Sequence, residues 1–260
     1  MNNQKTVLIT GASAGIGRAL AREFASHGYN LVLAARRKER LEVLQGSLTS
    51  DYHVRGDIYP VDLLQEDAPD RIMDFADREG ISVDILINNA GMGYAGLFAD
   101  MDWNSIKSIL DLNIIATTRM TYLFLRRMEE KNHGTIVNIA STLAFAPTAG
   151  EDVYAASKAY ILSFTQALYE ETKHTGVSVL TICPGMTRTE FFDQAGYSLN
   201  NFNLAIPEQF AAFAYKKIIE KKPLSIHRLF NQAVALFARL STRATARRAF
   251  AAACRTDSKD

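Results

Sequence analysis

Short apolar runs recur along the chain at intervals long enough for a helix, and this rhythm limits the possible folds more than any other feature. The runs are Val7–Ile9, Leu31–Leu33, Ile85–Ile87, Ile136–Val137 and Val177–Leu180. Continuously apolar strands are typical of a parallel sheet that is buried on both faces, and the lengths between them suit crossover helices. The sequence therefore predicts an α/β protein with a doubly wound parallel sheet.

Two of the intervening segments carry a helical period. Residues 15–27 repeat apolar side chains at helical spacing and are followed by Gly28, where a glycine often ends a helix. Residues 152–173 show the same period over a longer stretch. A weaker pattern predicts a third strand over residues 54–61, ending at Asp62.

The chain reads as one uninterrupted body followed by an unusual C-terminal segment. Its 260 residues suffice for one domain or at most two, and no linker or repeat comes before about residue 223. We expect a single domain over residues 1–227, with a substrate loop at about 186–206, and a helical extension over 228–260.

Composition excludes several classes of protein. A chain that is 48% hydrophobic and 22% charged, with a net charge of +1, is typical of globular enzymes and not of disordered chains or dedicated nucleic-acid binders. No apolar run approaches the roughly 18 residues that span a bilayer. Cys183 and Cys254 form no disulfide framework, and the scattered histidines show no metal-ligand spacing. We expect a soluble, cytoplasmic protein without a metal ion.

A glycine-rich turn, Thr10-Gly11-Ala12-Ser13-Ala14-Gly15-Ile16-Gly17, follows the first apolar run and opens the first predicted helix. Its Gly11-x-Ser13-x-Gly15 pattern matches the nucleophile elbow of hydrolases, but that fold needs an upstream oxyanion-hole loop and only nine residues precede Thr10. As a phosphate cradle, the small residues let the backbone approach a pyrophosphate beside a helix N-terminus. Leu20 replaces the third glycine of the generic dinucleotide fingerprint, so the turn alone also admits a ligand-free interpretation.

Four further motifs follow the glycine turn in order. They are Asn88-Asn89-Ala90-Gly91, Asn113, Ser141 and Tyr154-Ala155-Ala156-Ser157-Lys158. Together with Thr10-x-x-x-Gly-x-Gly17, they resemble the motif set of the short-chain dehydrogenase/reductase family over roughly residues 5–195. The resemblance implies a Rossmann-like fold and an oxidoreductase that uses a nicotinamide cofactor.

The resemblance implies catalytic roles for four residues. In the family the tyrosine, here Tyr154, exchanges a proton with the substrate oxygen, and the lysine, here Lys158, holds the nicotinamide ribose. The serine, here Ser141, polarises the carbonyl, and the asparagine, here Asn113, holds a water beside the lysine. Tyr154 and Lys158 are four residues apart, on one face of a helix. Because free tyrosine titrates near pH 10, we expect Lys158 and the oxidised nicotinamide to favour its phenolate.

The same resemblance implies a set of cofactor contacts in the glycine turn, after the second and third strands, after Asn88, and in the segment Pro184 to Thr189. They are Gly11, Ser13, Ala14, Gly15, Ile16, Gly17, Arg36, Arg37, Asp62, Asn89, Ala90, Gly91, Asn113, Tyr154, Lys158, Pro184, Gly185, Thr187 and Thr189. The family commonly has Val or Ile where Thr187 stands, a small departure because that contact is usually made through the backbone.

The end of the second predicted strand distinguishes the two nicotinamide cofactors. An NAD site usually has an acidic residue there, whereas this chain reads Ala34-Ala35-Arg36-Arg37-Lys38. A guanidinium is permanently charged and can bind a phosphate bidentately, so Arg36 and Arg37 favour NADP(H) over NAD(H). The alternative is that these are solvated basic residues at the start of the next helix.

Apolar residues dominate the segments expected around the nicotinamide, which indicates a hydrophobic substrate, although packing between loop and core would have the same composition. They are Met92, Tyr94, Leu97, Phe98, Leu143, Phe145, Met186, Phe191, Phe192 and Tyr197. We expect an NADP(H)-dependent carbonyl reductase, or the reverse alcohol dehydrogenase. The alternative from another class is a non-catalytic regulatory or interaction protein that binds the cofactor; an epimerase or dehydratase is a weaker alternative, because such relatives are often longer.

Residues 228–255 combine arginines, no acidic residue, and apolar side chains at roughly helical spacing. Such a helix can lie on an anionic membrane surface, dock on a partner subunit, or pack on the body with its arginines in solvent. Binding of nucleic acid would rest on these arginines alone, so we expect no nucleic acid as a partner. A homo-oligomer, either a dimer or a tetramer, is a family expectation, through helices near 104–130 and 152–173.

Overall fold

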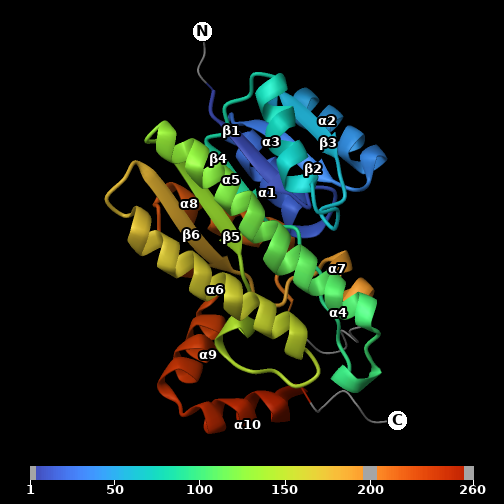
Figure 1. Cartoon of the computed structure of the whole chain (residues 1–260), viewed down its shortest axis with the longest axis vertical. Coiled ribbons are helices and arrows are strands. Elements are labelled where there is room, and N and C mark those ends of the chain that lie inside the picture. Colours follow the sequence, from blue (N-terminus) through green and yellow to red (C-terminus); the bar gives the residue numbers. More distant parts are fainter. Residues whose placement is uncertain (1–3, 196–203, 255–260) are drawn as a thin grey trace.

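The computed structural model describes residues 4–195 and 204–254. Within these ranges a seven-stranded parallel sheet, with strand order β3-β2-β1-β4-β5-β6-β7, lies between two layers of helices (Figure 1). The strands are β1 (Thr6–Thr10), β2 (Asn30–Ala35), β3 (Gly56–Pro60), β4 (Ile85–Asn88), β5 (Gly134–Ile139), β6 (Val177–Cys183) and β7 (Leu224–Ile226). The doubly wound parallel sheet predicted from the sequence is confirmed.

Helices α1, α2 and α8 cover one face of the sheet, and α3, α5 and α6 cover the other. The helices in the described ranges are α1 (Gly15–Ser26), α2 (Lys38–Tyr52), α3 (Ala68–Arg78), α4 (Trp103–Leu110), α5 (Thr117–Glu130), α6 (Asp152–Thr172), α7 (Glu190–Ala195), α8 (Pro207–Ile219), α9 (Leu229–Leu240) and α10 (Arg243–Cys254). Three short elements complete the fold, namely η1 (Phe98–Asp100), the π-helical η2 (Asp111–Ala116) and η3 (Thr142–Phe145).

The core divides according to the alternation of side chains along the strands. Val7 and Ile9 of β1 pack beneath α1 and α2, whereas Leu8 between them packs beneath α3 and α5, and all three are fully buried. Both faces of the central strands are therefore covered, which is why their sequences are continuously apolar.

Predicted and observed boundaries agree within a few residues for the elements that the sequence defined clearly. Helix α1 ends at Ser26, and Gly28 takes a φ of +78°, the conformation that ends a helix at little cost only for glycine. Strand β3 is shorter than the predicted 54–61. Strand β7 was missed because three residues carry too little pattern.

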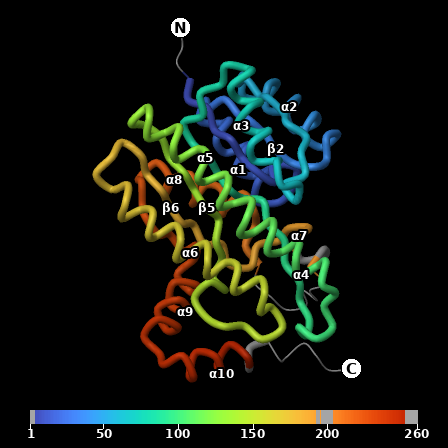
Figure 2. The backbone as a smooth tube through the Cα atoms, in the orientation of Figure 1, coloured from blue at the N-terminus to red at the C-terminus, as the bar shows by residue number. Residues whose placement is uncertain are grey.

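The C-terminal segment forms two helices rather than the single helix that the sequence suggested. The backbone is extended at Ser241, and the Thr242 hydroxyl then accepts a hydrogen bond from the N–H of Thr245 at 3.2 Å and begins α10. We call residues 229–254 the C-terminal arm. Its first helix contacts η3, which lies in the loop that joins β5 to α6 (Figure 2).

Candidate active site

All strands are parallel, so their carboxyl ends meet at one edge of the sheet, and the motifs singled out in the sequence follow those ends. The glycine turn follows β1, the Asn89–Gly91 segment follows β4, Ser141 follows β5 and Pro184 follows β6. Segments far apart in the sequence are thus brought to one place.

Thr10, which sequence analysis did not include among the site residues, joins two of these segments. Its Oγ1 accepts hydrogen bonds from the backbone N–H groups of Asn89 and Ala90, each at 3.0 Å. The Asn89 Nδ2 donates in return to the Thr10 carbonyl oxygen at 2.9 Å. The signal available in the sequence was a hydroxyl residue at the last position of an otherwise apolar strand.

The glycine turn depends on the absence of side chains. Gly11 and Gly15 take φ values of +68° and +51°, and a Cβ at Gly17 would lie 2.3 Å from the carbonyl oxygen of Gly11. Helix α1 begins after Ala14 with no side-chain cap and no acidic residue in its first turn. Its N-terminal N–H groups therefore suit a negatively charged group, as a pyrophosphate-binding turn requires.

A buried polar network lies directly behind this edge and was not predicted. The Asn88 Nδ2 donates to the Oδ1 of Asn138 at 2.8 Å and to the hydroxyl of Thr121 at 3.1 Å. The Asn138 Nδ2 donates to the Thr165 hydroxyl at 2.9 Å. The network fixes β4, β5, α5 and α6 relative to one another beneath the site.

Asn113 lies in the π-helical segment η2 between α4 and α5. Its Nδ2 donates to the carbonyl oxygen of Met92 and to the hydroxyl of Ser157, each at 2.9 Å, and its Oδ1 accepts from the Met92 N–H at 3.0 Å. The segment expected to be one helix near 104–130 thus contains a π-helical insertion, a feature often found at functional sites. The insertion places this amide against α6, beside the predicted catalytic residues.

Tyr154 and Ser141 face each other across the site. Burial raises the pKa of Tyr154, and its hydrogen bond with Ser141 acts in the opposite direction. The Nζ of Lys158 lies 5.8 Å from the centre of the Tyr154 ring. We expected Lys158 and the oxidised nicotinamide to favour the phenolate; burial of the phenol acts in the opposite direction and is the largest cause of the raised pKa of Tyr154.

Lys158 is nearly fully buried. Its Nζ donates to the carbonyl oxygen of Ile139 at 2.9 Å, and burial lowers its pKa to about 8. Within residues 4–195 and 204–254 no carboxylate pairs with this ammonium group. A Cβ on Gly91 would lie 3.2 Å from the Asn113 Oδ1 and 3.4 Å from the Lys158 Nζ, so this glycine lies directly against both side chains.

The segment from Pro184 to Thr189 crosses the open edge of the sheet. Thr189 lies against the glycine turn, because a Cβ on Gly15 would come within 2.9 Å of its Cγ2. The Thr187 hydroxyl donates to the Gly185 carbonyl oxygen at 3.0 Å. Asn231 of α9 lies against Gly185, where a Cβ would meet its Nδ2 at 2.2 Å, so the C-terminal arm also touches this segment.

The two arginines after β2 lie in different environments. Arg36 is exposed, whereas the guanidinium of Arg37 donates to the Ser13 hydroxyl at 3.3 Å and to the Glu190 carboxylate at 2.7 Å. Arg40 donates to the other oxygen of Glu190 at 2.6 Å. Arg37 first, and then Arg40, holds the pKa of Glu190 below its usual range. Sequence analysis missed Glu190, which lies far from both arginines in the chain.

Asp62 follows β3 and uses its carboxylate within its own loop. Its Oδ1 accepts a hydrogen bond from the Leu64 N–H at 3.1 Å, and the residue is partly buried. This arrangement holds the loop after β3 at the same edge as the glycine turn.

The apolar residues predicted to surround a substrate do not share one environment. Six of them are partly buried, namely Met92, Tyr94, Leu143, Phe145, Met186 and Phe191. Phe145 packs against the small core cluster around Ile161. Leu97 and Phe98 are mostly exposed. The side chain of Phe192 and the whole of Tyr197 lie outside the described residues.

Phe191 lies next to the predicted catalytic tyrosine. The Phe191 and Tyr154 ring centres are 5.4 Å apart, and a Cβ on Gly93 would contact both rings. An aromatic surface therefore borders the phenol on the side of α7.

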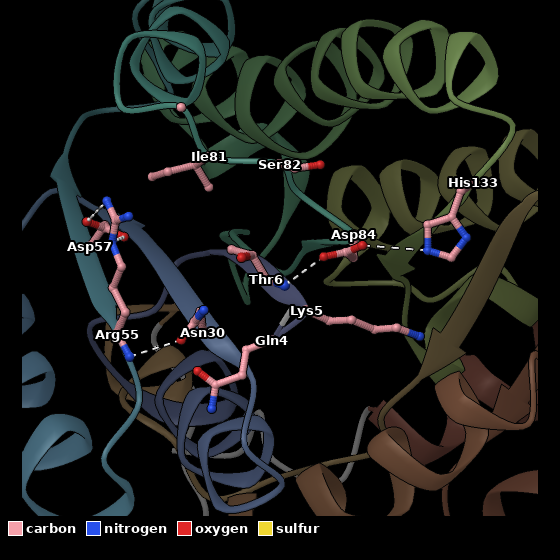
Figure 3. A pocket seen from close by; sticks show the side chains of 11 residues that line it. Gln4, Lys5, Thr6, Asn30, Arg55, Asp57, Ile81, Ser82, Asp84 and His133 are labelled. Carbon is pink, nitrogen blue, oxygen red and sulfur yellow. Dashed lines mark hydrogen bonds and ion pairs between the residues drawn. The ribbon is translucent and has the colours of Figure 1, made fainter. Parts of the chain in front are cut away.

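A polar hollow lies at the opposite edge of the sheet, around the amino ends of β1 and β2 (Figure 3). Several of its polar groups pair with one another: Asp84 accepts from the Thr6 N–H at 2.8 Å and pairs with His133 at 3.5 Å, while Arg55 pairs with Asp57 at 2.8 Å. None of the predicted site residues lines it.

Comparison with known proteins agrees with this geometry. The family model described as short chain dehydrogenase matches residues 5–198. The chain belongs to the short-chain dehydrogenase family. It is therefore an oxidoreductase by family, and the hydrolase interpretation of the Gly11-x-Ser13-x-Gly15 pattern is wrong.

Similar short-chain dehydrogenases come from distant organisms. The chain is 33% identical over 213 residues to a very-long-chain 3-oxoacyl-CoA reductase of Anas platyrhynchos, covering 80% of this chain and 66% of that protein. A short-chain dehydrogenase from Sphingobium yanoikuyae in complex with NADPH is 33% identical, with a TM-score of 0.83 over 90% of this chain and 93% of that one. The bulky-bulky ketone specific alcohol dehydrogenase from Comamonas testosteroni is 33% identical, with a TM-score of 0.79 over 94% and 97%.

Proposed function

We propose that this short-chain dehydrogenase interconverts a hydrophobic ketone or aldehyde and its alcohol, with NADP(H) as the cofactor and Tyr154 as the acid and base. The observation that carries the proposal is the convergence of Ser141, Tyr154, Lys158 and Asn113 at the carboxyl edge of the sheet. A non-catalytic cofactor-binding protein has no need for this full set.

The proton would pass through Tyr154. When bound, the reduced nicotinamide supplies a hydride to the carbonyl carbon. The Tyr154 hydroxyl then gives its proton to the carbonyl oxygen, which Ser141 polarises by hydrogen bonding. Because burial raises the pKa of Tyr154, the phenol carries at neutral pH the proton that this direction requires.

Lys158 and Asn113 would complete the site. The Lys158 ammonium would hold the nicotinamide ribose, since no carboxylate in the described ranges engages it. Asn113 would hold a water beside it and connect Tyr154 to solvent, while its bonds to Met92 and Ser157 keep its amide in place.

The remaining cofactor contacts follow the edge of the sheet. The turn from Gly11 to Gly17 would take the pyrophosphate, and the Asn89–Gly91 segment and Asp62 would line the adenosine. The segment from Pro184 to Thr189 would take the nicotinamide carboxamide. Support comes from the open backbone of the glycine turn and the uncapped start of α1.

The preference for NADP(H) rests on the residues after β2. The exposed Arg36 is free to approach a 2′-phosphate, and Arg37 already lies against the Ser13 hydroxyl, a second donor. The relative from Sphingobium yanoikuyae was solved with NADPH. An Arg36→Ala/Arg37→Ala double variant should raise the KM for NADPH far more than the KM for NADH; equal effects on both would remove the phosphate argument.

The substrate class rests on apolar surface near Tyr154. Phe191 borders the phenol, and Met92, Leu143 and Met186 are partly buried in the loops around it. One of the relatives above acts on bulky ketones and another on very-long-chain acyl groups, according to their names.

The assay that tests the function follows absorbance of the reduced cofactor with a panel of hydrophobic ketones and aldehydes. Turnover should prefer NADPH and fall by about a thousandfold or more in Tyr154→Phe, which removes one oxygen and the acidic proton. If Tyr154→Phe turns over normally, the proposed catalysis is wrong. If NADPH binds and no carbonyl reacts, the regulatory alternative is favoured.

We also propose a cytoplasmic homo-oligomer. Three large apolar or aromatic side chains of η2, α5 and α6 are exposed, namely Ile115, Tyr122 and Tyr160. They lie on the helices through which we expect subunits to pair, and Cys183 is buried as a free thiol, as in a reducing compartment. Light scattering should give a mass of at least two chains; a monomer would contradict the pairing.

A further inference from the structure

We propose that the outer face of the C-terminal arm binds an anionic lipid surface. This proposal goes beyond the oxidoreductase activity and rests on which side chains of α9 and α10 face outward. It selects one of the three interpretations that the sequence left open.

Helix α9 carries a stripe of exposed apolar side chains. Leu229, Phe230, Leu236, Phe237 and Leu240 are 82%, 76%, 56%, 44% and 79% exposed, and their spacing puts them along one side of the helix. The opposite side packs on the body through the buried Ala235 and the partly buried Val234. A helix that only packs on its own domain would turn its large apolar side chains inward. The exposed stripe is therefore complementary to an apolar surface outside the domain.

Basic groups adjoin this stripe. Arg239 of α9 and Arg243, Arg247 and Arg248 of α10 are exposed. No acidic residue occurs from residue 228 to residue 254. An apolar stripe with arginines beside it and no carboxylate is complementary to the acyl chains and the negative headgroups of an anionic lipid surface.

The same charge distribution disfavours the other occupants. Two copies pairing arm against arm would bring their arginines together with no carboxylate in either arm to neutralise them. Nucleic acid would pair with the arginines and leave the apolar stripe in water. Within the described ranges no helix is both long and apolar enough to cross a membrane.

The arm lies beside the candidate active site. Helix α9 contacts η3, which follows Ser141, and its Asn231 touches Gly185. Figures 1 and 2 show α9 and α10 together at the end of the molecule remote from the N-terminus. A lipid surface bound there would face the edge of the sheet at which we expect a hydrophobic substrate to enter.

Vesicle sedimentation tests the proposal with the full chain. Binding to vesicles of phosphatidylcholine with phosphatidylglycerol should exceed binding to pure phosphatidylcholine by about tenfold or more, and 0.5 M salt should weaken it. An Arg243→Gln/Arg247→Gln/Arg248→Gln variant should lower the partition coefficient by roughly tenfold to a hundredfold. Equal binding to both vesicle types, or unchanged binding of this variant, would overturn the proposal.

Matched controls separate the arm from general effects of charge and hydrophobicity. Lys216→Gln/Lys221→Gln/Lys222→Gln removes the same charge from exposed positions near the amino end of β7, at the other edge of the sheet, and should leave binding unchanged. An equal loss in this control would show that net charge alone drives binding and would refute the assignment to the arm.

The apolar stripe is tested by a second pair of variants. Leu229→Gln/Leu240→Gln should reduce vesicle binding at least several-fold, because each side chain loses its burial in lipid. Val43→Gln/Trp103→Gln changes similarly exposed apolar residues on α2 and α4 and should have no effect. If the arm variant instead lowers the oligomer mass in solution without vesicles, the stripe is an interface between copies and the lipid proposal fails.

Discussion

The buried charge of Lys158 should lower the free energy of unfolding, although the proposed catalysis requires this residue. Its ammonium group is nearly fully buried, donates to the Ile139 carbonyl oxygen, and pairs with no carboxylate in the described ranges. Replacing Lys158 by methionine, which has a similar shape and no charge, should therefore stabilise the fold while abolishing catalysis.

The magnitude follows from the effect of burial on the lysine. Burial lowers the pKa of Lys158 from its ordinary 10.5 to about 8. At about 1.4 kcal/mol for each tenfold change in proton affinity, burying the charge costs about 3 kcal/mol. Losing the hydrogen bond to Ile139 offsets about 1 kcal/mol of that gain. We expect Lys158→Met to be about 2 kcal/mol more stable at pH 7.

The difference should depend on pH in a specific way. Below about pH 8 the lysine is charged in both folded and unfolded chains, so the full cost of burial is present. Between about pH 8 and 10.5 the folded protein binds fewer protons than the unfolded chain, so the wild type gains stability as the pH rises. The advantage of Lys158→Met should therefore shrink across this interval. Above it the variant should be about 1 kcal/mol less stable than the wild type, because only the lost hydrogen bond to Ile139 still distinguishes the two proteins.

Urea unfolding of both proteins without cofactor, at several pH values from 7 to 10.5, measures this difference. Ionisation of other groups in the unfolded chain affects both proteins equally and cancels. The reasoning is refuted if Lys158→Met is less stable than the wild type at pH 7, or if its advantage does not change with pH.

Two further residues give independent tests. Glu190→Gln should tighten NADPH binding about two- to fivefold and leave NADH binding unchanged in fluorescence titration, because the carboxylate competes with a phosphate for Arg37 and Arg40. The effect is small because both ends of this ion pair are more than a third exposed; weaker NADPH binding would mean that Glu190 positions the arginines instead. Asn138→Ala should cost about 2–3 kcal/mol of unfolding free energy, because it leaves the buried Asn88 amide without its main acceptor. An unchanged unfolding temperature in Asn138→Ala would show that the network does not stabilise the fold.

Much of the fold follows from local sequence patterns. Buried strands such as β1 and β6 contain short runs of apolar residues because helices cover both faces of the sheet, and the recurrence of such runs between longer helical segments identifies them. Helices α1 and α6 are similarly clear. Strand β7 could not be predicted in this way. It is an outermost strand of three residues, and its pairing with β6 defines it, whereas its own sequence carries too little pattern.

The residues of the candidate site could be predicted where they belong to family motifs. The burial of these residues and their contacts with one another could not be predicted from the sequence. The sequence led to Tyr154 and Lys158, but the sign of the effect on the Tyr154 pKa depends on burial, which only the packed structure shows. Likewise, Glu190 meets Arg37 across a large separation in sequence, and Thr10 works through backbone groups of another loop. Such contacts arise from tertiary structure and leave no local pattern.

Deuterium transfer tests the central claim most directly. The protein is incubated with NADPH deuterated at C4 of the nicotinamide and a panel of hydrophobic ketones, and the alcohol products are examined by mass spectrometry. The account predicts alcohols that carry one deuterium on the former carbonyl carbon, and loss of this product in Tyr154→Phe. The account would be contradicted by alcohol without deuterium when the label is on the face of the nicotinamide that gives the hydride. Undiminished product in Tyr154→Phe would also contradict it.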